Sequence, residues 1–355
     1  MPQYYNMMVP NQVKVTNAIL RLIAELDEFK GSWKHLRFLS PDLLNTLRKV
    51  ATIESVGSST RIEGAKLSDR EVEELLSGLS AHSFRSRDEE EVAGYAEAMN
   101  VIFESFSDIS LTENHIKQLH AMLLKHSSKD ARHRGEYKKF PNHVEAFEKG
   151  GKSLGIIFET TSPFDTPRKM RELVEYTTKT LAEKELHPLI VIGIFVVYFL
   201  AIHPFQDGNG RLSRILTTLL LLRSGYEYVP YASLEAVIEA NKDDYYLSLR
   251  KTQRTFNTTR QNVEPWLTFF LRSLKAQKDT LARKIEHAKE LLELPALSRQ
   301  LLELAKLQGR LTLSIATKSI AANERTIRDH IRRLVKNGYL TKHGERKATF
   351  YTIAL

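Results

Sequence analysis

The stretch from His203 to Arg214 combines residue types that phosphoryl-group chemistry needs. Gly208 and Gly210 let backbone amides approach an oxyanion closely. They lie where a helix is expected to begin, and the free N–H groups and the dipole of a helix N-terminus favour phosphate. Arg211 and Arg214 are three residues apart, so they share one side of the first turn and can fork onto phosphate oxygens. The pattern predicts a polyphosphate site.

Two more side chains in this stretch supply a base and a metal ligand. His203 can accept a proton near neutral pH. Asp207 is a hard oxygen ligand suited to Mg²⁺ held between protein and phosphates. A base, a metal ligand and a phosphate cradle are what phosphoryl-type transfer requires. The plain alternative is a glycine-rich turn beside a buried histidine and surface arginines.

The stretch resembles the motif of the Fic family, His-x-Phe-x-(Asp/Glu)-Gly-Asn-Gly-Arg-x-x-Arg, and meets every fixed position. The resemblance implies an adenylyltransferase that moves AMP from ATP to a Ser, Thr or Tyr hydroxyl of a protein target and releases pyrophosphate. It implies that His203 deprotonates the hydroxyl, that Asp207 holds Mg²⁺ and that Arg214 binds the γ-phosphate. It assigns the α- and β-phosphates to Gly208, Asn209, Gly210 and Arg211.

The resemblance extends over roughly residues 90 to 255. Ile116, Leu119, His120 and the run 135–137 match family positions, and Lys138 stands where the family often has arginine. Residues 142–158 occupy the place of the family's flap, which aligns a target segment by strand pairing. The run Asp244–Leu247, which includes Tyr245 and Tyr246, resembles its adenosine-side wall. Tyr246 is the candidate to stack on adenine, Tyr245 fits helix packing equally well, and Gln253 follows where some members have asparagine.

A second motif predicts a built-in brake. Ser59, Glu63 and Gly64 match the family's inhibitory pattern (Ser/Thr)-x-x-x-Glu-(Gly/Asn). A Glu63 carboxylate paired with Arg214 would take away the γ-phosphate ligand and put negative charge where negative charge must bind. The alternatives are a solvated carboxylate at a helix end, and an enzyme that removes AMP with the same glutamate orienting a water. Other family members transfer a different nucleotide or phosphocholine.

The elements that must position these residues are mostly helical by apolar periodicity. The chain has 355 residues, 42% of them apolar and 27% charged, enough for two or three domains. The run Leu189–Ile202 is apolar throughout but too short to span a bilayer, so it predicts a buried helix and no membrane partner. The predicted helices are Val13–Phe29, Asp42–Val56, Ser68–Leu76, Glu89–Phe106, Leu111–Leu124, Pro167–Glu185, Pro188–Ile202, Gly210–Ser224, Ala232–Thr255 and Glu264–Leu292.

Two segments break the helical pattern. Asn142–Phe158 reads as a β-hairpin around the turn 148–152, and the tail carries two short strands, Gly338–Lys342 and Ala348–Ile353. We therefore expect a mainly α protein: a Fic-type helical core with a β-hairpin flap, plus a C-terminal winged-helix domain. The expected domains are an inhibitory helical region (1–89), a catalytic core (90–290) and a winged helix (291–355).

The tail is the basic part of a chain whose formal net charge is +9. Residues 325–347 hold eight Lys or Arg against Asp329 and Glu345, a formal charge of +6. If residues 297–355 bind DNA, then 324, 325, 328 and 332 would enter a major groove. A protein-contact or homodimer module of the same shape is an equal alternative, because fold does not fix function.

Composition excludes several kinds of functional site and indicates a compartment. The absence of cysteine excludes disulfides, thiolate metal sites and a cysteine nucleophile, and it fits a reducing cytoplasm. Residues 1–11 lack a basic start followed by an apolar stretch, so no signal peptide is expected. A third class of function, a transcription regulator whose core only senses nucleotide, also fits the sequence.

Overall fold

The computed structural model describes residues 13–36, 40–78, 84–142, 144–147, 153–256, 258, 261–345 and 348–354. These residues are mainly α-helical, as the sequence predicts. The chain divides into two compact units, Met1–Leu281 and Ala282–Leu355. Residues 1–11, where no signal peptide is expected, lie outside the described residues. No helix among the described residues is both long and apolar enough to cross a membrane.

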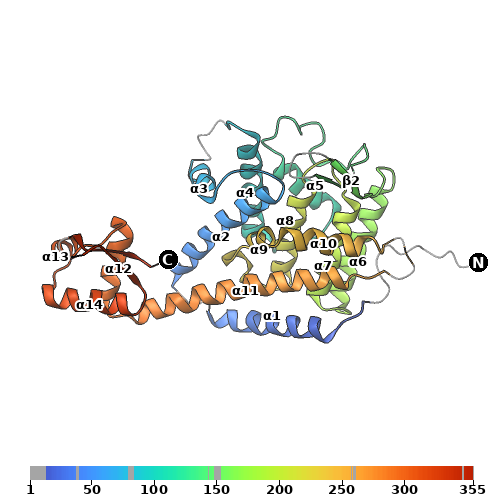
Figure 1. Cartoon of the computed structure of the whole chain (residues 1–355). Coiled ribbons are helices and arrows are strands. Elements are labelled where there is room, and N and C mark those ends of the chain that lie inside the picture. The colour runs from blue at the N-terminus through green and yellow to red at the C-terminus, as the bar shows by residue number, and fades with distance from the viewer. Residues whose placement is uncertain are drawn as a thin grey trace, which may run out of the picture. The chain divides into compact units, whose positions relative to one another are not determined.

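The first unit is a helical body with one hairpin (Figure 1). The long helix α11 (Glu264–Glu293) begins in this unit and ends in the second. Its other elements are α1 (Asn17–Leu36), α2 (Pro41–Ile62), α3 (Asp69–Ser77), α4 (Arg87–Ser105), α5 (Glu113–Leu123), β1 (Val144–Phe147), β2 (Ser153–Phe158), α6 (Thr166–Glu183), α7 (Pro188–Ile202), α8 (Asn209–Arg223), the 3₁₀ turn η2 (Val229–Tyr231), α9 (Leu234–Ala240) and α10 (Lys242–Gln253).

Two consecutive helices form the centre of this unit. Every residue of α7 from Leu189 to Ile202 is buried, as expected for a helix that is apolar all round. Helix α7 packs against α6, α8 and α10, and α8 packs in turn against α2, α4 and α5. The loop that joins α7 to α8 carries the predicted phosphate motif. The sequence thus places its chemistry between the two most buried helices of the fold.

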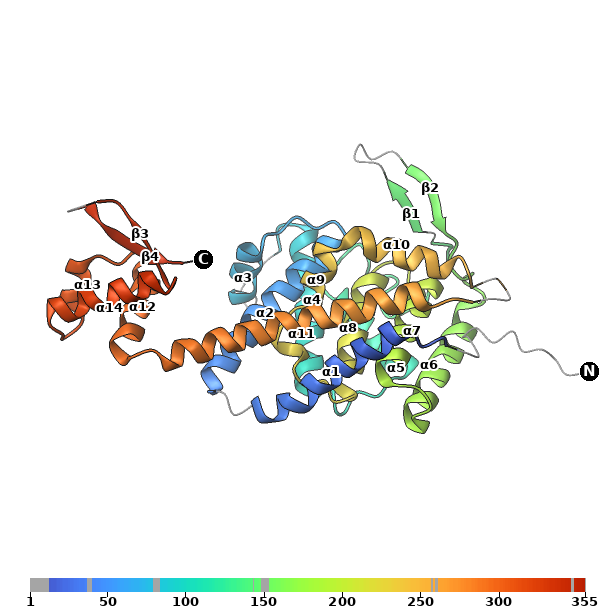
Figure 2. The ribbon, with the colours of Figure 1, turned by 60° about the horizontal axis from the view of Figure 1, so that its bottom comes forward.

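The predicted hairpin is confirmed. Strand β1 pairs antiparallel with β2, with Val144 opposite Phe158, and Figure 2 shows the pair projecting from the helical body. The predicted turn at 148–152 lies outside the described residues. The edge strands of a two-stranded sheet are in general able to pair with a further strand.

Most helices lie within two residues of their predicted bounds, and three predicted helices differ more substantially. Helix α2 runs past Val56 to Ile62, because burial of the weak helix formers 57–60 overrides their propensity. The predicted helix Ala232–Thr255 is two helices, since the backbone at Asn241 leaves the helical region (φ −121°, ψ 36°). The first helix begins at Asn17, where Thr16 accepts a hydrogen bond from the N–H of Ile19, and it continues to Leu36.

The second unit is small and has its own core. It contains α12 (Ala296–Gln308), α13 (Leu313–Ser319), α14 (Glu324–Lys336), β3 (Leu340–His343) and β4 (Phe350–Ile353). Its core includes Leu301, Ile327, Ile331 and Leu334, and β3 pairs antiparallel with β4. Three helices precede the strand pair, and the two strands predicted for the tail are present. The identification of this unit as a winged helix stays a prediction. The predicted tip residues 346 and 347 lie outside the described residues.

Candidate active site

The loop between α7 and α8 is shaped by two residues with positive φ. His203 ends α7 in the left-handed region (φ 53°, ψ 60°), and its N–H donates to the Phe199 carbonyl at 2.9 Å. A non-glycine residue held there is strained, which is common at functional sites. Gly208 caps α8 at φ 80°, a conformation that favours glycine. These two residues reverse the direction of the chain between α7 and α8, so that His203 and the first turn of α8 contribute to the same site.

The Asn209 side chain closes this loop from inside. Its Oδ1 accepts from the Phe205 N–H at 2.9 Å, and its Nδ2 donates to the Phe205 carbonyl at 2.7 Å. Asn209 is buried, so its amide group is used within the protein. The backbone N–H of Asn209 is the group left for phosphate, and its predicted phosphate contact stays a prediction in that form.

His203 is poised as a base. Its Nδ1 lies 3.3 Å from the Leu200 carbonyl, an arrangement that favours a proton on Nδ1 and leaves Nε2 as the acceptor. Burial, with a smaller contribution from the nearby Lys138 ammonium, lowers the pKa of His203 to about 4, outweighing the backbone bond to Leu200 and the carboxylates of Glu63 and Asp207. The imidazole is therefore neutral at physiological pH and able to take a proton.

The predicted brake residues lie against the motif. Arg214, whose side chain is only 3% exposed, donates from Nη2 to Glu63 Oε1 at 2.8 Å and from Nε to Ser59 Oγ at 2.8 Å. Ser59 and Glu63 are one helical turn apart at the end of α2, so both face the same guanidinium. Gly64 follows the helix at φ 109°, where other residues would be strained.

Glu63 occupies the N-terminus of α8. A Cβ added at Gly210 would lie 2.1 Å from Glu63 Oε1, so only glycine allows this approach. Burial alone would raise the pKa of the Glu63 carboxyl, but Arg214, supported by Arg211 and His203, lowers it overall. The carboxylate is charged and lies where helix geometry favours an anion.

Asp207 and Arg211 lie beside this anion site. Asp207 Oδ1 accepts from the Gly208 N–H and, at 3.2 Å, from Arg211 Nη2. Burial raises the pKa of Asp207, yet Arg211 and the other donors lower it overall, so the side chain is a carboxylate. The Arg211 Nε is buried and has no hydrogen-bond partner among the described residues, which suits a phosphate oxygen that arrives with a substrate.

The two tyrosines of α10 differ in exposure. Tyr245 is 4% exposed and packs edge-on against Trp266, with ring centroids 5.8 Å apart. Tyr246 is 37% exposed, so its ring is the one available to an adenine base. Gln253 ends the helix and is buried. The adenosine assignments of Tyr245 and Tyr246 stay predictions, with Tyr245 fitting the packing alternative.

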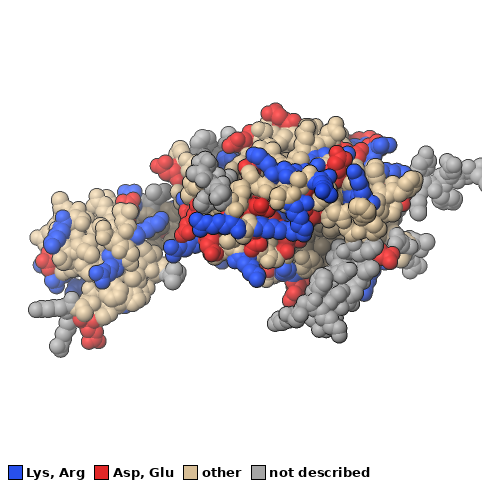
Figure 3. Space-filling model, turned by 90° about the horizontal axis from the view of Figure 1, so that it is seen from above, with Lys and Arg blue, Asp and Glu red and all other residues tan. Residues whose placement is uncertain are grey.

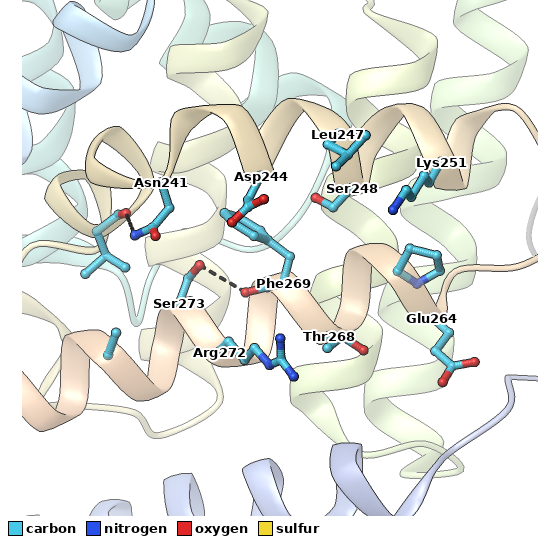
Figure 4. A pocket seen from close by; sticks show the side chains of 13 residues that line it. Asn241, Asp244, Leu247, Ser248, Lys251, Glu264, Thr268, Phe269, Arg272 and Ser273 are labelled. Atoms are coloured by element: carbon cyan, nitrogen blue, oxygen red, sulfur yellow. Dashed lines mark hydrogen bonds between the residues drawn. The ribbon is translucent and has the colours of Figure 1, made fainter.

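A hollow of about 700 Å³ lies between α10 and α11 (Figure 4). Asp244, Leu247 and Lys251 line it from α10, and Phe269 and Arg272 line it from α11. Asp244 and Leu247 belong to the predicted adenosine-side wall, but none of the predicted base, metal, phosphate-binding or inhibitory residues is among its lining residues. It therefore plays no part in the chemistry of the motif.

His120 is a site residue to which the sequence assigns no role beyond a match to a family position. Its Nδ1 accepts from the Gly135 N–H at 2.9 Å, so Nε2 carries the proton and donates to the Asp207 carbonyl at 3.0 Å. Its ring stacks on Phe205 with centroids 3.8 Å apart. Burial lowers the pKa of His120 to about 4, which keeps this tautomer at neutral pH. His120 thus fixes the backbone of Asp207.

Lys138 links the hairpin to the catalytic loop. Its Nζ donates to Asn142 Oδ1 at 2.8 Å, to Thr160 Oγ1 at 2.9 Å and to the Ile202 carbonyl at 3.0 Å. Asn142 Nδ2 donates to the carbonyl of His203 at 3.3 Å. Asn142 precedes β1 and Thr160 follows β2, so one buried ammonium holds both ends of the hairpin. Burial lowers the pKa of Lys138 to about 8.

Comparison with known proteins agrees with this geometry. The model of the Fic/DOC family matches residues 110–221. A Fido domain-containing protein of Dictyostelium discoideum is 34% identical over 113 residues, which cover 29% of this chain and 71% of that protein. A Drosophila grimshawi protein named protein adenylyltransferase Fic is 29% identical over 208 residues, 58% of this chain. The chain spans 40% of that relative's length.

The fold is shared with solved structures. A Fic family protein from Desulfovibrio desulfuricans superposes with a TM-score of 0.61 at 22% sequence identity, over 96% of this chain and 98% of that one. The family match covers the His203–Arg214 stretch together with His120 and Lys138. Motif, relatives and fold agree, and the chain belongs to the Fic/DOC family.

Proposed function

We propose that this protein transfers AMP from ATP to a Ser, Thr or Tyr hydroxyl of a protein target. The observation that carries the proposal is a neutral, partly buried His203 beside the N-terminus of α8, where helix geometry favours an anion. The target hydroxyl oxygen attacks the α-phosphorus as its proton passes to His203 Nε2. The bond from the α-phosphorus to the oxygen bridging to the β-phosphate breaks, and pyrophosphate leaves with that oxygen.

The α8 N-terminus and two arginines would hold the triphosphate. The amides near Gly208 and Gly210, with Arg211, bind the α- and β-phosphates, and Arg214 binds the γ-phosphate. Tyr246 lies against the adenine. The hairpin pairs with a target segment and brings the hydroxyl to His203.

Asp207 would hold Mg²⁺. Among the described residues no group of three or more His, Asp or Glu is placed to bind a metal. A site with one carboxylate suits Mg²⁺ that takes its other ligands from phosphates and water. The bound ion neutralises charge on the polyphosphate.

Glu63 would restrain the reaction. Its carboxylate bonds Arg214 and lies over Gly210 where a phosphate would sit, which supports the inhibitory assignment of Ser59, Glu63 and Gly64. ATP then binds with its α-phosphate out of line for attack. On this proposal residues 1–89 are the inhibitory region of a catalytic core at 90–290. The cysteine-free sequence supports a cytoplasmic setting.

ATP labelled at the α-phosphate, and separately at the γ-phosphate, tests the reaction type. We expect the protein to become labelled from α-labelled ATP only, since the phosphoanhydride bond next to the α-phosphorus breaks. Label from the γ position would identify a kinase instead. A nucleotide-sensing regulator would take up neither label.

As a second candidate function we propose that the C-terminal unit binds duplex DNA. A groove of about 740 Å³ lies between α14 and the strand pair, lined by Arg328, Arg332 and Lys336 of α14 and Lys342 of β3. Lys and Arg side chains are visible on this unit in Figure 3 (left, blue). A basic groove beside a helix suits a phosphate backbone.

Removing groove charge should weaken DNA binding and its salt dependence. We expect Arg328→Ala with Arg332→Ala to lower duplex affinity at low salt. The slope of log affinity against log salt should fall by about 0.9 for each phosphate that the protein no longer neutralises. The pair Arg299→Ala with Lys306→Ala removes equal charge from α12 outside the groove and should change binding little. Fluorescence anisotropy with a labelled duplex measures both. If neither pair alters binding, the protein-contact or homodimer reading replaces the DNA reading.

A further inference from the structure

The proposed function assigns no role to the ion pair between Arg87 and Asp207. Arg87 Nη2 lies 2.6 Å from Asp207 Oδ2, while Asp207 Oδ1 accepts from Gly208 and Arg211. Both oxygens of the proposed metal ligand are therefore occupied by donors. A divalent cation at Asp207 Oδ2 would meet the guanidinium as a like charge at close range.

Arg87 belongs to a closed ring of alternating charges. It is the first residue of α4, and its Nε donates to Glu91 Oε1 at 2.8 Å. The second oxygen of Glu91 lies 2.9 Å from Arg211 Nη1, and Arg211 returns to Asp207. The formal charges of these four side chains cancel. Glu63 and Arg214 cancel in the same way beside the ring.

This balance leaves little net negative charge for a free cation. In the described part of the site, three carboxylates pair with three guanidiniums: Glu63 with Arg214, Glu91 with Arg211 and Arg87, and Asp207 with Arg87 and Arg211. A cation that arrives alone must displace one of these partners without compensation. A cation that arrives with a polyphosphate brings negative charge that can replace the lost pairing.

Arg87 is the partner able to leave. Its side chain is 42% exposed, whereas that of Arg211 is 3% exposed. Breaking the ion pair of a guanidinium that is already partly in water costs little free energy. Unpairing a buried guanidinium costs far more. Arg87 can also keep its bond to Glu91 when it releases Asp207.

We propose that Arg87 competes with the divalent cation for Asp207, so that the resting site rejects free metal and admits it together with nucleotide. This inference rests on the proposed role of Asp207 as metal ligand. Arg87 begins α4 and Glu63 follows the last turn of α2, so both belong to the proposed inhibitory region, residues 1–89. This region would therefore block the phosphate-binding part of the site and the metal-binding part as well. Glu63 covers an arginine that should bind phosphate, and Arg87 covers a carboxylate that should bind metal.

The test measures metal binding and needs no turnover. Mn²⁺ replaces Mg²⁺, and the electron paramagnetic resonance signal of free Mn²⁺ gives its binding to the full-length protein without nucleotide. We expect Arg87→Ala to bind Mn²⁺ about two- to fivefold more tightly than the unmodified protein, the range for losing an exposed ion pair. Arg87→Gln should bind Mn²⁺ with the same increase in affinity, and it replaces the alanine variant if that variant is unstable.

The matched control is Arg85→Ala. Arg85 is exposed two residues before Arg87, so its loss removes the same charge without opening Asp207. We expect Mn²⁺ affinity to stay within experimental error of the unmodified protein. With a non-hydrolysable ATP analogue present, the difference between Arg87→Ala and the unmodified protein should shrink, because phosphate charge then offsets the displaced guanidinium.

Failure of the competition by Arg87 and failure of the metal assignment of Asp207 give different results. Folded Arg87 variants that bind Mn²⁺ no more tightly than the unmodified protein, or no more tightly than Arg85→Ala, overturn the competition. Asp207→Asn should lose Mn²⁺ binding in the Arg87→Ala background. If Mn²⁺ binding persists there unchanged, Asp207 is not the metal ligand, and it is that part of the proposed function that fails.

Discussion

Replacing Glu63 with glycine should raise AMP transfer by about 5- to 1,000-fold, because charges about 4 Å apart repel by roughly 1–4 kcal/mol between the bulk-water and near-surface limits. The change frees Arg214 and removes a carboxylate from the N-terminus of α8. ATP can then settle with its α-phosphate in line for attack. Self-labelling from α-labelled ATP, compared with the unmodified protein at equal concentration, measures the gain.

Two companion variants separate charge from partner. Glu63→Gln keeps the size of the side chain and loses its charge, so it should recover much of the gain if repulsion is the cause. Glu63→Gly with Arg214→Ala should lose the gain, since the liberated partner is gone, and the two changes should be strongly non-additive. An enzyme that removes AMP would instead lose hydrolysis of modified target in Glu63→Gly. A folded, ATP-binding Glu63→Gly protein that labels nothing contradicts the restrained-transferase proposal.

His203→Ala should lower AMP transfer by about 10²–10⁴-fold, the usual contribution of a general base. The comparison is best made in the Glu63→Gly background, where activity is high enough to measure the loss. Nucleotide binding should stay nearly unchanged, because the phosphate contacts come from α8. A folded His203→Ala variant with undiminished transfer would show that another group takes the proton.

The pH profile gives a second check on His203. Its pKa is lowered to about 4, and the neutral ring is the active base. The value of kcat/KM should therefore stay flat as pH falls from about 8 to about 5.5 and decline only toward about pH 4, since this parameter follows the free enzyme. An acid limb near the ordinary histidine value, about 6.5, would mean that burial does not lower the pKa of His203.

The motif and the helices were predictable because both rest on local pattern. The spacing of His203, Asp207 and Arg214 encodes one loop and one helical turn, and the apolar run of α7 can only be a buried element. The Ser59 and Glu63 pattern pointed to Arg214, and the structure places these side chains in contact. Local sequence carries the spacing within each helix because the helix sets the direction of each side chain, whereas the pairing of Glu63 with Arg214 is what the family resemblance implied.

Contacts between distant segments that no motif marks were not predictable. Arg87 meets Asp207 across 120 positions, and nothing in the run 85–91 marks one arginine as different from its neighbours. The end of α2 was missed because burial, not propensity, keeps residues 57–60 helical. The split at Asn241 was missed because apolar residues continue on both sides of it.

The three bonds of the Lys138 ammonium have a consequence for target choice. They join the residues before β1 and after β2 to the end of α7, so the strand pair is attached to the helical body at both of its ends. A segment attached in this way resembles the variable binding loops that rigid scaffolds position in other proteins. On the proposed role of the hairpin in aligning targets, substitutions between these two anchor points should change target choice, while the bonds of Lys138 and Asn142 hold the end of α7 and the His203 backbone in place.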